Sequence, residues 1–179
     1  MRIGYQGEPH SYSSLAVAEL FSDHEAVGFR SFAACFEAVQ SGAVDRLVLP
    51  VSNSITGDIE EVRGRLSEFE EVGELTMAIG HALLILPGAD VSRIARVKSH
   101  SVALSQAAGY LAERGWAAVV TTDTAGAARE VVEAGDPTTA ALASPRAAVY
   151  GLEIAETAVA DAADNNTRFV ALKKRASNF

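Results

Sequence analysis

Cysteine is almost absent from this 179-residue chain, and its scarcity excludes a disulfide-stabilised fold. The single Cys35 has no partner for an intramolecular disulfide, which favours a reducing, cytoplasmic compartment. Phe32, Phe36 and Val39 lie on the same face of a helix as Cys35 if this segment is helical. We therefore interpret Cys35 as a buried small hydrophobe rather than a nucleophile.

Concentrated positive charge is also lacking. The formal net charge is −8, and Lys173-Lys174-Arg175 is the one basic cluster. A protein that binds nucleic acid usually carries a basic surface, so we expect no nucleic-acid partner. A small anionic substrate remains compatible with this composition, because a pocket can be locally positive inside an acidic protein.

Signal-like and membrane-spanning segments are not found. The N-terminal residues 1–7 contain no apolar signal region, and the apolar run 78–87 is too short to cross a bilayer. We expect a cytoplasmic protein with no membrane partner. No spacing of His, Cys, Asp and Glu suggests a metal site. Gly4-x-x-Gly7 lacks the dinucleotide-binding fingerprint, so we expect neither a metal nor a nucleotide cofactor.

Strand-like and helix-like segments alternate along the chain, which predicts an α/β fold. The predicted strands span 2–6, 26–30, 46–51, 96–98, 117–121, 139–143, 152–156 and 168–172, with one or two more within 74–86. The predicted helices span 11–21, 31–42, 102–114 and 124–134, and Ser144-Pro145 begins another.

One further helix is predicted after residue 57. Asp58 is placed as its N-cap with Glu61 at the third helical position. The expected buried stripe of this helix consists of Ile59, Val62, Leu66 and Phe69.

The chain shows no internal repeat and no proline-rich linker, so we expect one domain made of two lobes. Residues 1–78 and 166–179 are assigned to the first lobe, and residues 79–165 to the second. The fold class is α/β, two-lobed and similar to type II periplasmic binding proteins, with a mixed sheet in each lobe. A cleft between such lobes is the expected small-molecule site.

Six short motifs follow one another along the chain. They are Gly4-Tyr5-Gln6-Gly7 with Ser11-Tyr12-Ser13, the segments 49–57, 97–100, 123–128 and 140–151, and Asp161 with Asn165-Asn166-Thr167-Arg168-Phe169. In this order they resemble the catalytic domain of the prephenate dehydratase family. The last motif matches D-x-x-x-N-x-T-R-F without a change, and the first has the longer form of plant arogenate dehydratases.

The resemblance implies a lyase of phenylalanine biosynthesis that converts prephenate to phenylpyruvate with loss of carbon dioxide and water. It implies a small dicarboxylate substrate, with arogenate as a further candidate, no cofactor, and a homodimer. The ring hydroxyl is a poor leaving group that needs a proton as it departs. The family assigns this work to the threonine of T-R-F, which is Thr167 here.

The predicted substrate contacts are mostly neutral donors at strand ends and helix starts. Such donors can hold the side-chain carboxylate without stabilising the ring carboxylate against decarboxylation. They are Ser11, Tyr12, Ser13, Ser52, Asn53, Ser54, Ser99, His100, Thr124, Asn165, Arg168 and Phe169. Strand alternation puts Thr167 and Phe169 on one side. It leaves Arg168 with either an ion pair or a substrate carboxylate.

The motifs depart from the family pattern at two places. Ser52 replaces a glutamate, and Ser101-Val102 replaces Pro-Gln. The chain also ends at Phe179, so we expect it to lack the regulatory ACT domain. Two other functions stay open: a decarboxylase of a prephenate analogue that retains the ring hydroxyl, and a non-catalytic protein that binds small anions.

Overall fold

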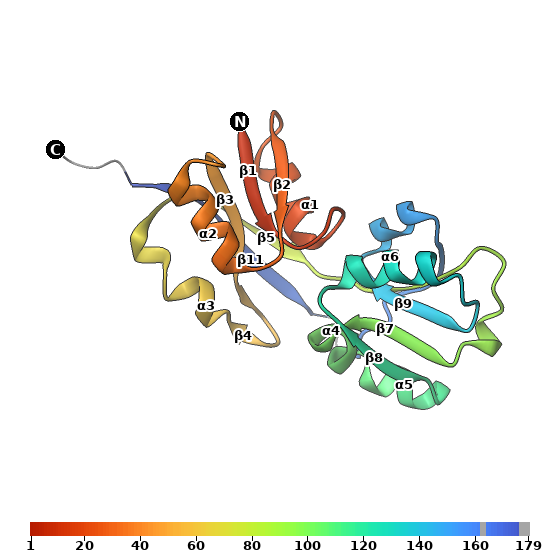
Figure 1. Cartoon of the computed structure of the whole chain (residues 1–179). Helices are drawn as coiled ribbons and strands as arrows, with labels where there is room; N and C mark the ends of the chain where they lie inside the picture. Colours follow the sequence, from red (N-terminus) through yellow and green to blue (C-terminus); the bar gives the residue numbers. More distant parts are fainter. Residues whose placement is uncertain (162–163, 176–179) are drawn as a thin grey trace. The chain divides into compact units, whose positions relative to one another are not determined.

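The computed structural model describes residues 1–161 and 164–175, and the chain forms two compact units (Figure 1). Unit 1 comprises Met1–Ile79 and Asp164–Phe179, and unit 2 comprises Gly80–Ala163. The lobe boundaries expected from the sequence, 78/79 and 165/166, lie within two residues of these. Each unit is an α/β structure built on a mixed sheet, as the sequence predicts.

The sheet of unit 1 has the strand order β2-β1-β3-β11-β5, and β4 pairs with the end of β3. The strands are β1 (Arg2–Gln6), β2 (Glu25–Phe29), β3 (Arg46–Asn53), β4 (Gly57–Asp58), β5 (Phe69–Ala78) and β11 (Asn166–Lys174). β1, β2 and β3 run parallel, whereas β11 is antiparallel to both of its neighbours. The helical segments are α1 (Tyr12–Leu20), α2 (Phe32–Ser41), α3 (Glu60–Arg63) and the 3₁₀ helix η1 (Leu66–Glu68).

Both faces of this sheet are covered. On the α1 face, Val17 packs with Ile3 and Phe169. On the α2 face, Phe36 stacks on Phe69 with ring centroids 5.3 Å apart. Cys35 belongs to this second core and is fully buried, which confirms its interpretation as a small hydrophobe. Burial raises the pKa of its thiol to about 12.

The sheet of unit 2 has the order β10-β6-β9-β7-β8. Its strands are β6 (Ala82–Ile85), β7 (Arg96–His100), β8 (Ala117–Thr121), β9 (Thr139–Ala143) and β10 (Glu153–Thr157). α4 (Ser101–Gln106) and α5 (Ala108–Arg114) cover one face; α6 (Thr124–Ala134) and the 3₁₀ helix η3 (Pro145–Tyr150) cover the other. The remaining 3₁₀ helix is η2 (Val91–Arg93).

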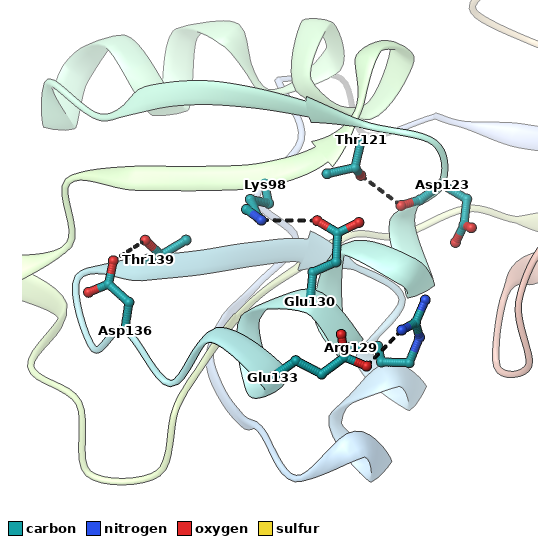
Figure 2. Close-up of polar contacts among 8 residues, drawn as sticks. All are labelled: Lys98, Thr121, Asp123, Arg129, Glu130, Glu133, Asp136 and Thr139. Carbon is teal, nitrogen blue, oxygen red and sulfur yellow. Dashed lines mark hydrogen bonds and ion pairs between the residues drawn. The ribbon is translucent and has the colours of Figure 1, made fainter.

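Polar contacts join α6 to this sheet (Figure 2). Lys98 on β7 forms an ion pair of 3.0 Å with Glu130 on α6. In the turn that follows α6, the Asp136 carboxylate accepts from Thr139 at 2.8 Å and from Thr138. Bonds to Thr138 and Thr139 hold the pKa of Asp136 well below its usual value. These contacts fix the path of the chain from α6 into β9.

The predicted start of the helix over 31–42 at Ser31 is confirmed, and the helix over 124–134, which the sequence begins at Asp123 or Thr124, has Asp123 as its N-cap. Ser31 Oγ accepts from Ala34 N at 3.2 Å, and an Asp123 carboxylate oxygen accepts from Gly126 N at 2.6 Å. α2 ends at Gly42, whose φ of 78° is the left-handed conformation that glycine tolerates best. The sequence signals for these ends are local, which is why they can be read without a structure.

The helix predicted from Asp58 is wrong. Asp58 lies in β4 and forms an ion pair with Arg63, while α3 is only four residues long and Ile59 precedes it. Phe69 begins β5, where its backbone pairs with Lys174 of β11. Two residues of the expected buried stripe, Val62 and Phe69, are nevertheless buried in the core. Strand pairing with a distant segment therefore overrides the local helical periodicity.

Two other predicted helices differ from the structure. The helix expected over 102–114 is divided at Ala107, whose φ of −119° and ψ of 20° separate α4 from α5. The segment after Ser144-Pro145 is a 3₁₀ helix rather than an α-helix, although Ser144 caps it as expected.

We predict that unit 2 loses stability in mild acid through His81, which precedes β6 and is 4% exposed. Burial lowers its pKa from 6.5 to about 4. Between these values the unfolded chain binds a proton that the folded chain does not, so stability falls as the pH falls. From pH 7 to pH 5 this contributes a loss of about 2 kcal/mol.

Urea denaturation of the wild type and of His81→Gln at pH 7 and pH 5 measures this contribution. The variant cannot titrate at this position, so its stability should change less over that interval. An identical pH dependence in the two proteins would contradict the assignment.

Candidate active site

Polar side chains gather at one edge of the unit 1 sheet. The parallel strands β1 and β3 end at this edge, and β11 begins there, because Thr167 pairs with Asn53. The loop after β1 leads to the start of α1, which places Ser11 beyond the same edge. In open α/β sheets, ligands bind outside the carboxyl ends of the strands.

Asn53, the last residue of β3, is the centre of this cluster. Its Nδ2 donates to Asn165 Oδ1 at 2.6 Å and to Thr167 Oγ1 at 2.9 Å. Its Oδ1 accepts from Ile55 N at 2.9 Å and from Thr56 N at 3.1 Å. One amide thus links the turn after β3 to the start of β11.

Thr167 is only 8% exposed, and its hydroxyl oxygen accepts the Asn53 bond. An amide N–H can only donate, so the Thr167 proton is not used in that contact. The hydroxyl can therefore donate to a second oxygen while the amide holds it. This is the geometry that a proton donor requires.

Asn165 and Ser54 fix the backbone where β11 begins. Asn165 is 2% exposed, and its carbonyl accepts from Ile79 N at 2.7 Å. Ser54 Oγ donates to the Asp164 carbonyl at 3.1 Å and accepts from Asn166 N at 2.9 Å. The structure therefore gives both predicted site residues bonds within unit 1.

The predicted contacts near α1 lie at its first turn. Ser11 is the N-cap, with its Oγ 3.4 Å from Ser14 N. Tyr12 packs against the core cluster that contains Phe169, and Ser13 is buried. The N-terminus of α1 therefore presents hydroxyls and backbone N–H groups, which is the arrangement that binds anions.

Arg168 and Phe169 point to opposite faces of β11, as strand alternation predicts. Phe169 is buried among the α1-face core residues. The Arg168 guanidinium bonds Glu74 at 2.7 Å and Glu71 at 3.3 Å, both on β5. Of the two roles that the sequence left open for Arg168, this structure contains the ion pair.

In unit 2, the predicted residues lie near the carboxyl ends of β7 and β8. His100 is the N-cap of α4, and its Nδ1 is 3.3 Å from Val102 N. Thr124 is the first residue of α6, directly after Asp123; Figure 2 shows the bond from Thr121 Oγ1 to the Asp123 carbonyl.

Ser99 differs from its prediction as a substrate contact. Its side chain is fully buried, and its hydroxyl donates to the Leu142 carbonyl at 2.5 Å. Ser99 lies inside β7 rather than at a helix start, so its hydroxyl joins β7 to β9. The helix N-terminus that the sequence assigned to it belongs to His100.

Asp161 has a role that sequence reasoning missed, although it opens the last motif. Its carboxylate accepts from Gly109 N at 2.9 Å and from Tyr110 N at 3.1 Å. These are the first free N–H groups of α5, so Asp161 caps this helix from a distant segment. The contact explains how α5 can start anew after Ala107.

Two other kinds of site are absent from the described residues. None of the helices there is both long and apolar enough to cross a membrane. Within residues 1–161 and 164–175, no three His, Cys, Asp or Glu side chains lie close enough together to hold a metal ion.

Comparison with known proteins gives a consistent result. A family model described as prephenate dehydratase matches residues 3–177. Arogenate dehydratase 3, chloroplastic, of Arabidopsis thaliana is 39% identical over 182 residues, which cover 97% of this chain and 42% of the relative. The chain thus spans less than half the length of this relative.

Solved structures share the fold. Prephenate dehydratase from Arthrobacter aurescens, in complex with L-Phe, superposes with a TM-score of 0.88 at 22% identity, covering 99% of this chain and 61% of that one. A periplasmic substrate-binding protein of an ABC transporter from Coxiella burnetii gives a TM-score of 0.51 at 14% identity, covering 97% and 84%. These similarities agree with the expected fold class.

We predict that Asp161→Ala destabilises unit 2 by about 1 kcal/mol, because two N–H groups of α5 lose their acceptor. Urea denaturation measures the change. Asp164→Ala is the matched control, since Asp164 accepts from Ser54 Oγ through its backbone carbonyl, which the substitution retains. Equal stability of the two variants would show that the Asp161 cap contributes nothing measurable.

Proposed function

Because the chain belongs to the prephenate dehydratase family, we propose that it converts prephenate to phenylpyruvate as a lyase of phenylalanine biosynthesis. In this reaction the bond from the ring to its carboxylate breaks and its electrons enter the ring. The bond to the ring hydroxyl breaks at the ring carbon para to the one that loses the carboxylate. The hydroxyl leaves as water after taking up one proton, and the products are phenylpyruvate, carbon dioxide and water.

The observation that carries this proposal is the hydroxyl of Thr167. Asn53 holds its oxygen from one side with an N–H donor, and its proton is left for another acceptor. We assign that proton to the departing ring oxygen, which makes Thr167 the general acid. The Asn53 N–H then stabilises the negative charge that develops on Oγ1 as the proton leaves.

The surroundings of Thr167 also suit decarboxylation. The groups around its hydroxyl are neutral: the Asn53 amide at the end of β3 donates to it and also bonds the Asn165 amide, and Phe169 lies on the same side of β11. The nearest cation along the strand, Arg168, is paired with Glu74 and Glu71. A strong cation at the ring carboxylate would stabilise the ground state and raise the barrier to its loss, so a neutral environment favours the reaction.

Arogenate is the second substrate of this proposal. It carries an amino group where prephenate carries the side-chain keto group, and the same loss of carbon dioxide and water gives phenylalanine. The Arabidopsis relative is named an arogenate dehydratase, which supports testing both compounds. Mass spectrometry of the products separates dehydration from simple decarboxylation, since only the latter retains the ring hydroxyl.

We further propose that the protein is a cytoplasmic homodimer. The dimer follows from the family resemblance, and the buried, unpaired Cys35 is compatible with a reducing compartment. Size-exclusion chromatography with light scattering tests the dimer. A mass near 18.8 kDa, that of one chain, would contradict it.

We predict that Thr167→Val lowers kcat for prephenate at least about 100-fold, because the valine has the same shape but no proton to donate. Phenylpyruvate formation, followed by its absorbance, measures the rate. Thr76→Val is the matched control, since Thr76 is an exposed threonine on the neighbouring strand β5.

Thr76→Val should turn over at nearly the wild-type rate. Full activity of Thr167→Val would show that this hydroxyl is not the acid. Tight binding of prephenate by a folded wild type without any product would instead favour the anion-binding alternative.

A further inference from the structure

We propose that Asn53 is a positioning residue that sets the direction of the Thr167 hydrogen bond, and that it is not a substrate contact. This inference rests on the proposed function, because it concerns the residue that orients the proposed acid. It revises the role that the sequence predicts for Asn53. The argument depends on the hydrogen-bonding capacity of a single side-chain amide.

The orientation of the Asn53 amide is determined by its neighbours. The backbone N–H groups of Ile55 and Thr56 both point at one of its two terminal atoms, at 2.9 and 3.1 Å. Backbone N–H groups can only donate, so that atom is the oxygen. The other terminal atom is therefore the nitrogen, and it faces β11.

The Asn53 side chain has no capacity left for a ligand. Its two N–H bonds are used by Asn165 Oδ1 and Thr167 Oγ1. Its oxygen accepts the two backbone N–H groups, and the Thr56 hydroxyl lies 3.4 Å away. A primary amide offers two donors and two acceptor lone pairs, so a substrate bond would have to displace an existing one.

This saturation has a direct consequence for Thr167. A threonine hydroxyl can rotate, and its proton could point at any nearby acceptor. With an N–H donor on its oxygen, the hydroxyl proton must point away from Asn53. The amide therefore favours rotations of the hydroxyl that direct its proton away from Asn53. The Asn53 N–H also remains in place to stabilise the oxygen when the proton is transferred.

The turn after β3 contributes to this positioning, because its backbone N–H groups at Ile55 and Thr56 orient the Asn53 amide. The turn includes Gly57 with a φ of +82°, and Gly57 pairs back onto Asn53 through β4. The turn thus acts on Thr167 through Asn53.

Asn53→Asp tests this inference with almost no change of shape. The carboxylate keeps an acceptor for Ile55 N and Thr56 N, but it presents an acceptor to Thr167 where the amide presented a donor. The hydroxyl proton is then drawn toward the carboxylate and away from the substrate. We expect kcat for prephenate to fall about 100-fold, with KM changed less than about threefold.

Asn166→Asp is the matched control. It makes the same substitution one residue before Thr167, on the opposite face of β11, and adds the same charge near the site. Its kcat should stay within about threefold of the wild type. Thermal unfolding of both variants checks that each is folded under the assay conditions.

Three outcomes of the kinetics would overturn the inference. One is an Asn53→Asp kcat within about threefold of the wild type. The second is a loss that lies in KM alone, which would identify Asn53 as a substrate contact. The third is an equal fall of kcat in Asn166→Asp, which would attribute the effect to added charge.

A second measurement does not depend on activity. In the wild type, NMR should show both Asn53 side-chain N–H protons engaged in hydrogen bonds. Thr167→Val should shift one of them upfield and leave the other nearly unchanged, because only one has lost its acceptor. Unchanged resonances would overturn the inference, whereas an inactive wild type with the expected shift would overturn only the proposed function.

Discussion

Asn53 joins the end of β3 to the start of β11 with bonds that span 112 and 114 positions of the sequence. These bonds lie within unit 1, whose two segments are separated along the sequence by unit 2. β11 is the strand between β3 and β5, so the continuity of the whole sheet depends on it. The same amide holds the hydroxyl of Thr167. The same side chain therefore both ties β11 into the sheet and orients the proposed acid.

Arg168 shows how the departure at Ser52 is accommodated. Ser52 pairs with Arg168 across the β3–β11 ladder, so a residue at this position is a direct cross-strand neighbour of the arginine. Here it supplies no charge. Glu74 and Glu71 on the other neighbouring strand pair with the guanidinium instead. The positive charge is thus balanced from β5, and an acidic side chain on β3 is not needed for that purpose.

The features that the sequence predicts correctly have local causes. The caps at Ser31 and Asp123 depend on bonds to residues three positions away, and the burial of Cys35 follows from helical spacing. The errors have distant causes. Phe69 is a strand residue because β11 pairs with it, and the 102–114 helix is divided where Asp161 supplies a cap. The motifs predict Asn53 and Thr167 as site residues, but only the three-dimensional contacts reveal that the Asn53 amide uses all of its hydrogen-bonding groups.

The order of the strands in unit 1 also determines how the chain can fold as it is synthesised. Residues 80–163 are continuous, so unit 2 can complete its sheet as soon as its own segment has left the ribosome. Unit 1 cannot, because β11 is made after the whole of unit 2 and must insert between β3 and β5. Until then those two strands expose unpaired backbone edges, which are prone to aggregation. A nascent chain that stalls before residue 166 would therefore carry one finished unit and one open sheet, a natural substrate for chaperones.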